Sequence, residues 1–202
     1  MKILLASASP RRKQLLEETG YQVECIVSGA EEIEDHSFSP ADLALENATR
    51  KACAVAEKSP DRIVIAADTV VWRDGSFFGK PSDFEDAFRI LKELVGRTHE
   101  VVTGVVIRFP GGALTKFTES SRVTFHALVD GEIRRYLKSI NPLDKAGAYA
   151  AQDDNGRIIK KIEGSVTNVI GLPVEQIEAI LDCWSTTGCS AREKRPADAA
   201  RG

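Results

Sequence analysis

The sequence is poor in the residues that build metal centres and disulfide scaffolds. Its 202 residues include only four cysteines and three histidines. The cysteines form no C-x-x-C pair, and a chain of this length does not need disulfides to fold. The histidines lack the spacing of a zinc site. These features argue against structural zinc and favour reduced thiols in a cytoplasmic protein.

Long apolar runs and an excess of positive charge are absent as well. No apolar stretch approaches the ~20 residues that span a bilayer. The short apolar stretch at the N-terminus precedes its arginines, which is the reverse of a signal peptide. The formal net charge is −3, whereas a general nucleic-acid-binding protein presents a basic face. We therefore expect neither a membrane nor a nucleic acid as partner, and the local basic clusters must bind a compact anion.

Several common nucleotide-binding and hydrolase motifs are missing too. The sequence contains no G-x-x-x-x-G-K-[ST] phosphate loop and no G-x-G-x-x-G fingerprint. It contains no G-x-S-x-G elbow and no kinase motif set. Asp68-Thr69 also lacks the second aspartate of a D-x-D phosphatase. These absences exclude the familiar site types that such motifs mark.

Strand and helix patterns alternate along the chain, which predicts an α/β domain. The expected strands are residues 2–6, 21–27, 62–72, 99–109 and 115–128. The expected helices start near Ser9, Ser39 and Ser82, with two more at 131–138 and 174–184. Ser82 and Glu85 have the spacing of a capping box. We expect one domain over residues 1–184 and a polar, flexible tail over 185–202.

The N-terminal segment predicts an anion site. The strand at 2–6 leads through Ser7 into a helix with Ser9 as N-cap and Pro10 as its first residue. Arg11 and Arg12 follow in the first turn, where the helix dipole already places about half a positive charge. Amide N–H groups, serine hydroxyls and arginine forks together suit a polyphosphate. The alternative is a solvated helix start with extended arginines.

Asp68 is the sharpest candidate for chemistry. It is expected at the end of an apolar strand, where a buried carboxylate is costly unless it is paired or bound to a cation. Ligands bind at strand ends in open α/β sheets, although a turn cap or a salt bridge is the structural alternative. Lys51 borders the packed face of a helix, and a hairpin at Asp74-Gly75 returns Lys80 toward the Asp68 strand. Each lysine is either a phosphate contact or a surface residue.

An acidic loop at 31–35 supplies further carboxylates. One of them, together with Asp68, suits Mg²⁺, which keeps several waters and takes few protein ligands. For Glu34 and Asp35 we expect solvent exposure instead. Later in the chain, Gln152 offers a donor and an acceptor that suit the edge of uracil or thymine. The connector at 164–173 is expected to be structural, and the alternative is that Ser165 or Asn168 lines the cleft.

Six segments, taken in order, resemble the Maf family of nucleoside triphosphate pyrophosphatases. The matching segments are residues 5–12, 67–71, 79–81, 94–99, 144–152 and 164–173. They extend over nearly the whole chain up to about Cys183. The resemblance implies an α/β fold of the Maf/ITPase type, with a mixed twisted sheet, flanking helices and two lobes around a nucleotide cleft.

The resemblance also implies hydrolysis between the α and β phosphates, which yields a nucleoside monophosphate and pyrophosphate. It assigns the general base to Asp68. It places Ser7, Arg11, Arg12, Glu32, Lys51 and Lys80 in the active site, and it links Arg11, Thr69 and Gln152 to base choice. We expect the basic side chains to hold the triphosphate, and Asp68 with Glu32 to hold a divalent cation, Mg²⁺ or Mn²⁺.

The run at 144–149 with Gln152 is similar to the dTTP/UTP branch of the family rather than the 7-methyl-GTP branch. Asp153-Asp154 departs from the family pattern and adds negative charge beside the expected base pocket. Three alternatives stay open: a phosphatase that releases the γ-phosphate, a non-catalytic nucleotide-binding regulator of cell division, and a 7-methyl-GTP pyrophosphatase. A homodimer is an expectation from the resemblance alone.

Overall fold

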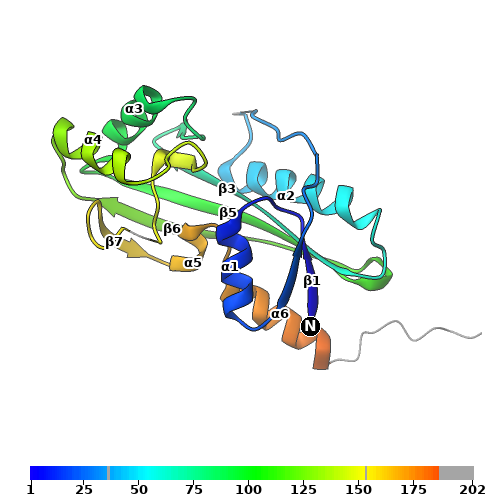
Figure 1. Ribbon diagram of the computed structural model, residues 1–202. Helices are drawn as coiled ribbons and strands as arrows, with labels where there is room; N and C mark the ends of the chain where they lie inside the picture. The colour runs from blue at the N-terminus through cyan, green and yellow to red at the C-terminus, as the bar shows by residue number, and fades with distance from the viewer. Residues whose placement is uncertain (36, 153, 187–202) are drawn as a thin grey trace, which may run out of the picture.

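A seven-stranded mixed sheet forms the centre of the molecule (Figure 1). The computed structural model describes residues 1–35, 37–152 and 154–186, so residues 187–202 of the expected tail lie outside the described residues. The strands are β1 (Lys2–Leu5), β2 (Gln22–Cys25), β3 (Ile63–Arg73), β4 (Ser76–Phe77), β5 (Thr98–Arg108), β6 (Leu114–Phe125) and β7 (Ile159–Glu163). The helices are α1 (Pro10–Glu18), α2 (Pro40–Ala56), α3 (Phe84–Leu94), α4 (Asp130–Ser139), α5 (Val166–Ile170) and α6 (Val174–Thr186), with short 3₁₀ turns η1 (Pro110–Gly112) and η2 (Ala146–Ala148).

The strand order is β2-β1-β3-β5-β6-β7, and β4 pairs with β3. β1 runs parallel to both β2 and β3, whereas every pairing from β3 to β7 is antiparallel. The predicted α/β class and mixed sheet are therefore confirmed. Across the described ranges, every helix is too short or too polar to cross a bilayer.

The core consists of three buried clusters, two in the first lobe of the molecule and one in the second. In the first lobe, α1 and α6 cover one face through residues such as Leu16 and Ile177, which pack with Ile65 of β3. α2 covers the opposite face, where Ala52 packs with Val64. In the second lobe, α3 and α4 pack over the far end of the sheet, away from α6 and β1 (Figure 1). The long strands β3 and β5 run through both lobes and join them.

Gly104 allows α2 to lie directly against the sheet. It is the β5 partner of Asp68 in β3, and paired residues of neighbouring strands point to the same face. A Cβ at Gly104 would lie 2.6 Å from the carbonyl oxygen of Ala44 in α2. The missing side chain thus brings the α2 backbone close to Asp68, and with it the polar residues on that face of the helix.

One local prediction was wrong, and one strand was not predicted. Ser82 does not cap α3, because Asp83 is the N-cap and accepts the Asp86 amide hydrogen at 2.8 Å. Glu85, the other half of the expected capping box, pairs with Arg134 of α4 instead. The sequence reasoning also missed β7, a short strand on β6 with largely exposed charged residues.

Candidate active site

A cleft of about 770 Å³ opens beside one edge of β3, between the two lobes. β1 occupies this edge only at Ile63–Ile65, and β4 occupies it only at Trp72 and Arg73. Residues 66–71 have no strand neighbour there within the described ranges. Every side chain predicted for the site lines this cleft: Ser7, Arg11, Arg12, Glu32, Lys51, Asp68, Thr69, Lys80 and Gln152. The structure therefore brings together residues from segments far apart in the sequence.

Asp68 lies in the middle of β3, which agrees with the expected strand at 62–72 but not with the prediction that Asp68 stands at a strand end. β3 continues to Arg73, and Asp68 pairs with Gly104 inside the sheet. It is β1 that ends, at Leu5, and this leaves the β3 edge beside Asp68 open. The cost of burying a carboxylate, which was expected for a strand end, still applies, because Asp68 is only 8% exposed where it borders the cleft.

Lys51 joins two carboxylates. Its Nζ lies 2.6 Å from Oδ1 of Asp68 and 2.6 Å from Oε1 of Glu32. Lys51 is itself buried on the inner face of α2, which agrees with its predicted inward-leaning position. Partial burial would raise the pKa of Glu32, but the hydrogen bond from Lys51 and the positive charges of Lys51, Lys80 and Arg12 outweigh it, so the pKa is lowered. Glu32 is therefore an anion at neutral pH.

The sequence reasoning missed Asn47, which belongs to the same cluster. Its side chain is buried in the cleft wall. Oδ1 accepts the amide hydrogen of Ile33 at 2.7 Å, and Nδ2 donates to the carbonyl of Ile33 at 3.1 Å and to Oδ2 of Asp68 at 3.4 Å. The signal was an asparagine one helical turn before Lys51 on an alanine-lined face, because residues at i and i+4 share one side of a helix.

Arg12 donates to three acceptors from two separate segments, β3 and the turn between α5 and α6. Nε bonds to the carbonyl of Gly171 at 2.8 Å, Nη1 to the carbonyl of Ala67 at 2.8 Å, and Nη2 to Oγ1 of Thr69 at 2.9 Å. Burial lowers the pKa of Arg12, and the negative charge of Asp68 opposes that effect. The guanidinium thus ties α1 to β3 and to the turn between α5 and α6, and it fixes the hydroxyl of Thr69.

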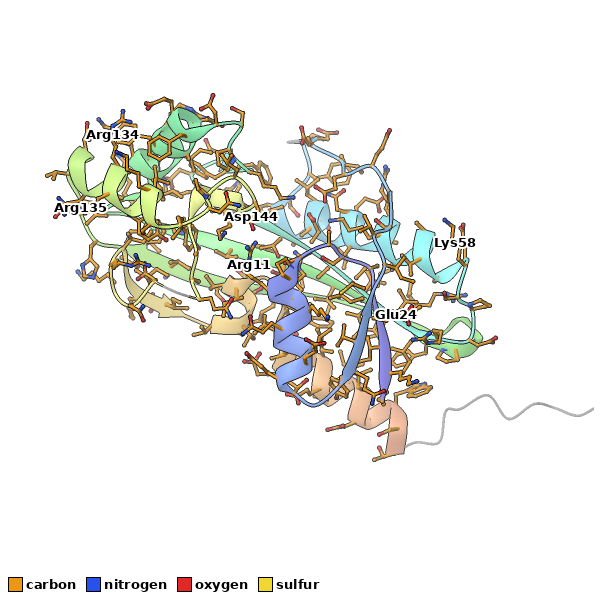
Figure 2. The ribbon with its side chains drawn as sticks, in the orientation of Figure 1. Arg11, Glu24, Lys58, Arg134, Arg135 and Asp144 are labelled. Atoms are coloured by element: carbon orange, nitrogen blue, oxygen red, sulfur yellow. The ribbon has the colours of Figure 1, made fainter. Side chains whose placement is uncertain are left out.

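Arg11 spans the mouth of the cleft. Its Nη1 forms an ion pair of 2.8 Å with Oδ2 of Asp144, which lies in the loop after α4 (Figure 2). Asp144 also pairs with Lys145 at 2.6 Å. Burial would raise the pKa of Asp144, but hydrogen bonds from Lys145 and Arg11 lower it overall. An anion that binds Arg11 must therefore compete with Asp144 or share the guanidinium with it.

The start of α1 is open to a ligand. Ser9 occupies the N-cap position as predicted, yet its side chain makes no capping hydrogen bond. The nearby Ser7 hydroxyl accepts the Ser9 amide hydrogen at 3.1 Å instead. The N–H groups of the first helical turn, which a side chain often caps, are therefore available to an anion in the cleft.

The remaining candidates differ in their surroundings. Lys80, which follows the β3–β4 hairpin, lines the cleft and is exposed. Gln152, which follows η2, lines the cleft from the second lobe. Asp154 does not add charge to the base pocket as expected, because its buried carboxylate accepts the amide hydrogens of Ile158 and Ile159 at 3.0 and 2.9 Å. Asp153 lies outside the described residues.

The donor set at Asp68 suits a divalent cation of the oxygen-seeking kind. In the part of the chain that the structure describes, no group of three or more His, Cys, Asp or Glu side chains could hold a metal by itself. Asp68 and Glu32 nevertheless converge on Lys51, which takes one oxygen of each carboxylate. Two carboxylates completed by water and phosphate oxygens are a typical Mg²⁺ environment.

Solved structures with a similar fold support the architecture. The Ham1 protein of Staphylococcus aureus superimposes with a TM-score of 0.54 at 17% sequence identity, over 91% of this chain and 99% of that chain. A HAM1 protein from Coxiella burnetii gives a TM-score of 0.50 at 14% identity, over 90% and 98% of the two chains. At these identities the similarity establishes the fold alone.

Sequence relatives are much closer. A protein of Akkermansia muciniphila named dTTP/UTP pyrophosphatase is 44% identical over 180 residues, which are 89% of this chain and 95% of that protein. A protein of the same name from Carboxydothermus hydrogenoformans is 44% identical over 185 residues, 91% of this chain and 99% of the relative. The family model described as Maf-like protein matches residues 2–184. The chain therefore belongs to the Maf family.

Proposed function

We propose that this chain hydrolyses nucleoside triphosphates between the α and β phosphates and releases a nucleoside monophosphate and pyrophosphate. dTTP and UTP are the favoured substrates, because the close relatives that span nearly the whole chain are named dTTP/UTP pyrophosphatases. The observation that carries the proposal is the cleft in which Asp68 and Glu32 meet Lys51, with Arg11 and Lys80 along the same walls.

The triphosphate is held by the cationic side of the cleft. Arg11 and Lys80 supply exposed or half-exposed positive charge, and Ser7 with the uncapped amides of α1 supplies hydrogen-bond donors. Arg12 adds positive charge behind them while it holds Thr69 in place. Since a triphosphate carries several negative charges, this arrangement offsets the repulsion that the two carboxylates would otherwise exert.

Asp68 acts on the attacking water. Lys51 holds Oδ1 of Asp68 at 2.6 Å, whereas Asn47 contacts Oδ2 only at 3.4 Å, so Oδ2 is the oxygen available to a proton or a cation. A divalent cation, Mg²⁺ or Mn²⁺, held by Asp68 and Glu32 would supply charge for the phosphate oxygens and lower the pKa of a bound water. General-base help contributes about 10²–10⁴ in rate, so most of the acceleration comes from positioning and electrostatics.

The base is recognised on the other side of the cleft. Gln152 offers one donor and one acceptor to the edge of a pyrimidine. Thr69 directly follows Asp68 in β3, so the two side chains point to opposite faces of the sheet. Its hydroxyl is held by a hydrogen bond from Arg12. This division separates base recognition from the acidic cluster, because successive residues of a strand point to opposite faces.

A nucleotide panel tests the proposal. UTP, dTTP, other triphosphates and 7-methyl-GTP are incubated with and without Mg²⁺ or Mn²⁺, and the products are separated. We expect UMP and pyrophosphate from UTP. UDP with phosphate would identify a γ-phosphatase, binding without turnover would identify a regulator, and preference for 7-methyl-GTP would move the chain to the other branch.

We also propose a reducing compartment and a homodimeric state for this enzyme. Cys25 and Cys53 are exposed thiols, which is typical of a reducing compartment such as the cytoplasm. We propose that this chain forms the homodimer that the family resemblance implies. Light scattering coupled to gel filtration at several protein concentrations measures the mass directly.

A further inference from the structure

Asn47 docks the acidic loop onto α2. Its carboxamide pairs with the backbone of a single residue, because Oδ1 accepts from the Ile33 amide at 2.7 Å and Nδ2 donates to the Ile33 carbonyl at 3.1 Å. Ile33 directly follows Glu32, whose carboxylate Lys51 binds. Asn47 thus fixes the backbone of the loop at the residue next to Glu32, whose side chain joins Lys51 and Asp68.

The same carboxamide reaches the second carboxylate. Nδ2 of Asn47 lies 3.4 Å from Oδ2 of Asp68, while Lys51, one helical turn later, takes Oδ1 at 2.6 Å. Two residues on one face of α2 therefore contact the two oxygens of Asp68 separately, and the same two residues hold the loop of Glu32. Asn47 is only 3% exposed, so this arrangement is built into the packed interface between α2 and the sheet.

We propose that Asn47 is a positioning residue that sets the spacing and orientation of Glu32 and Asp68 for a divalent cation. In this role Asn47 acts through the two carboxylates and is not itself a ligand of the cation. Outer partners of this kind orient metal-binding side chains, and their loss typically costs ~10–100-fold in metal affinity or activity. The inference rests on the proposed function, because the cation and the nucleotide belong to it. A role limited to anchoring the loop would change stability and loop exchange alone.

Two substitutions separate these roles. Asn47→Ala removes the carboxamide, and Asn47→Ser leaves a hydroxyl that can bond the carbonyl one turn earlier but cannot reach Ile33. Ser121→Ala is the matched control, since Ser121 is 1% exposed and donates to the Ser165 carbonyl at 2.9 Å away from the cleft. Melting curves first establish which variants are folded at the assay temperature.

The readouts are Mn²⁺ affinity of the nucleotide-free protein by electron paramagnetic resonance, and kcat and KM for UTP. We expect both Asn47 variants to lose ~10–100-fold in Mn²⁺ affinity and in kcat, with KM for UTP changed less than ~3-fold because the cationic contacts remain. Ser121→Ala should match the wild type in all three. A folded Asn47 variant with wild-type Mn²⁺ affinity and kcat overturns the proposal.

One measurement needs no variant. Hydrogen exchange of the loop at 31–35 in the wild type should slow when Mn²⁺ is added, because the cation and Asn47 restrain the same segment. Unchanged exchange at saturating Mn²⁺ would show that the cation does not engage the loop of Glu32. Asn47 would then have no pair of metal-binding carboxylates to position, and the proposal would fail. A wild-type protein that binds Mn²⁺ but releases no pyrophosphate from any nucleotide overturns the proposed function instead, and the two failures are thereby distinguished.

Discussion

Arg11 and Arg12 are adjacent in the sequence, yet they have different chemical roles. Arg11 reaches across the cleft mouth to Asp144 with a partly exposed guanidinium, so it can exchange this partner for a phosphate. Arg12 uses Nε, Nη1 and Nη2 on protein acceptors, among them Thr69. The sequence predicted both as triphosphate ligands because both lie in the first turn of α1. Their separate roles depend on the α5–α6 turn, which no local pattern connects to α1.

Arg12→Lys tests this difference. A lysine keeps the charge but has no planar fork, so it cannot serve Gly171, Ala67 and Thr69 together. We expect the free energy of unfolding to fall by about 2–3 kcal/mol, since hydrogen bonds from charged groups contribute that much. Chemical denaturation measures it. Arg11→Lys is the control, with a loss below ~1 kcal/mol for a partly exposed pair, and equal stability of Arg12→Lys and the wild type would refute the tying role.

At the scale of elements, β5 and the η2 loop meet in a buried aromatic group. Nε2 of His99 lies 3.1 Å from the hydroxyl of Tyr149, and both rings pack edge-on against Phe125. Burial, assisted by the positive charge of Arg73, lowers the pKa of His99 to about 4. Tyr149 also lines the cleft, so the neutral histidine helps to hold a wall of the site.

This burial predicts a pH dependence of stability. The pKa of His99 is about 4 in the folded chain against an ordinary 6.5, so between these values the unfolded chain binds a proton that the folded chain does not. The contribution of neutral His99 to the free energy of unfolding is fully present above pH 6.5. As the pH falls toward 4, the free energy of unfolding decreases by roughly 3 kcal/mol. Urea titrations at pH 7 and 4.5 measure it. His99→Gln should show a smaller decrease, and an identical decrease in both proteins would contradict this origin.

The elements themselves were largely predictable from hydrophobic periodicity. The buried run of β3 and the amphipathic face of α3 carry strong local signals. β7 was missed because a five-residue, mostly exposed strand has little hydrophobic content. It is its pairing with β6 that makes this segment a strand. The start of α3 was misplaced because Ser82 and Asp83 both suit a cap, and only tertiary contacts decide between them.

For the whole molecule, the site is a product of topology. β1 stops at Leu5 while β3 continues, and this leaves the open strand edge beside Asp68. Gly104 then lets α2 bring Lys51 and Asn47 to that edge. The sequence identified most of the charged lining residues through their residue types and the family resemblance. It could not identify the open strand edge beside Asp68, because that edge depends on which strand ends first. It overlooked Asn47, whose local signal is its spacing from Lys51.

The most direct test of the account is pyrophosphate release from UTP by Asp68→Asn, measured beside UTP binding by calorimetry. Asparagine preserves the shape of the side chain but neither takes a proton nor balances Lys51. We expect a folded protein that still binds UTP and releases pyrophosphate about 10²–10⁴-fold more slowly than the wild type. Pyrophosphate release at the wild-type rate would contradict the central role of this carboxylate.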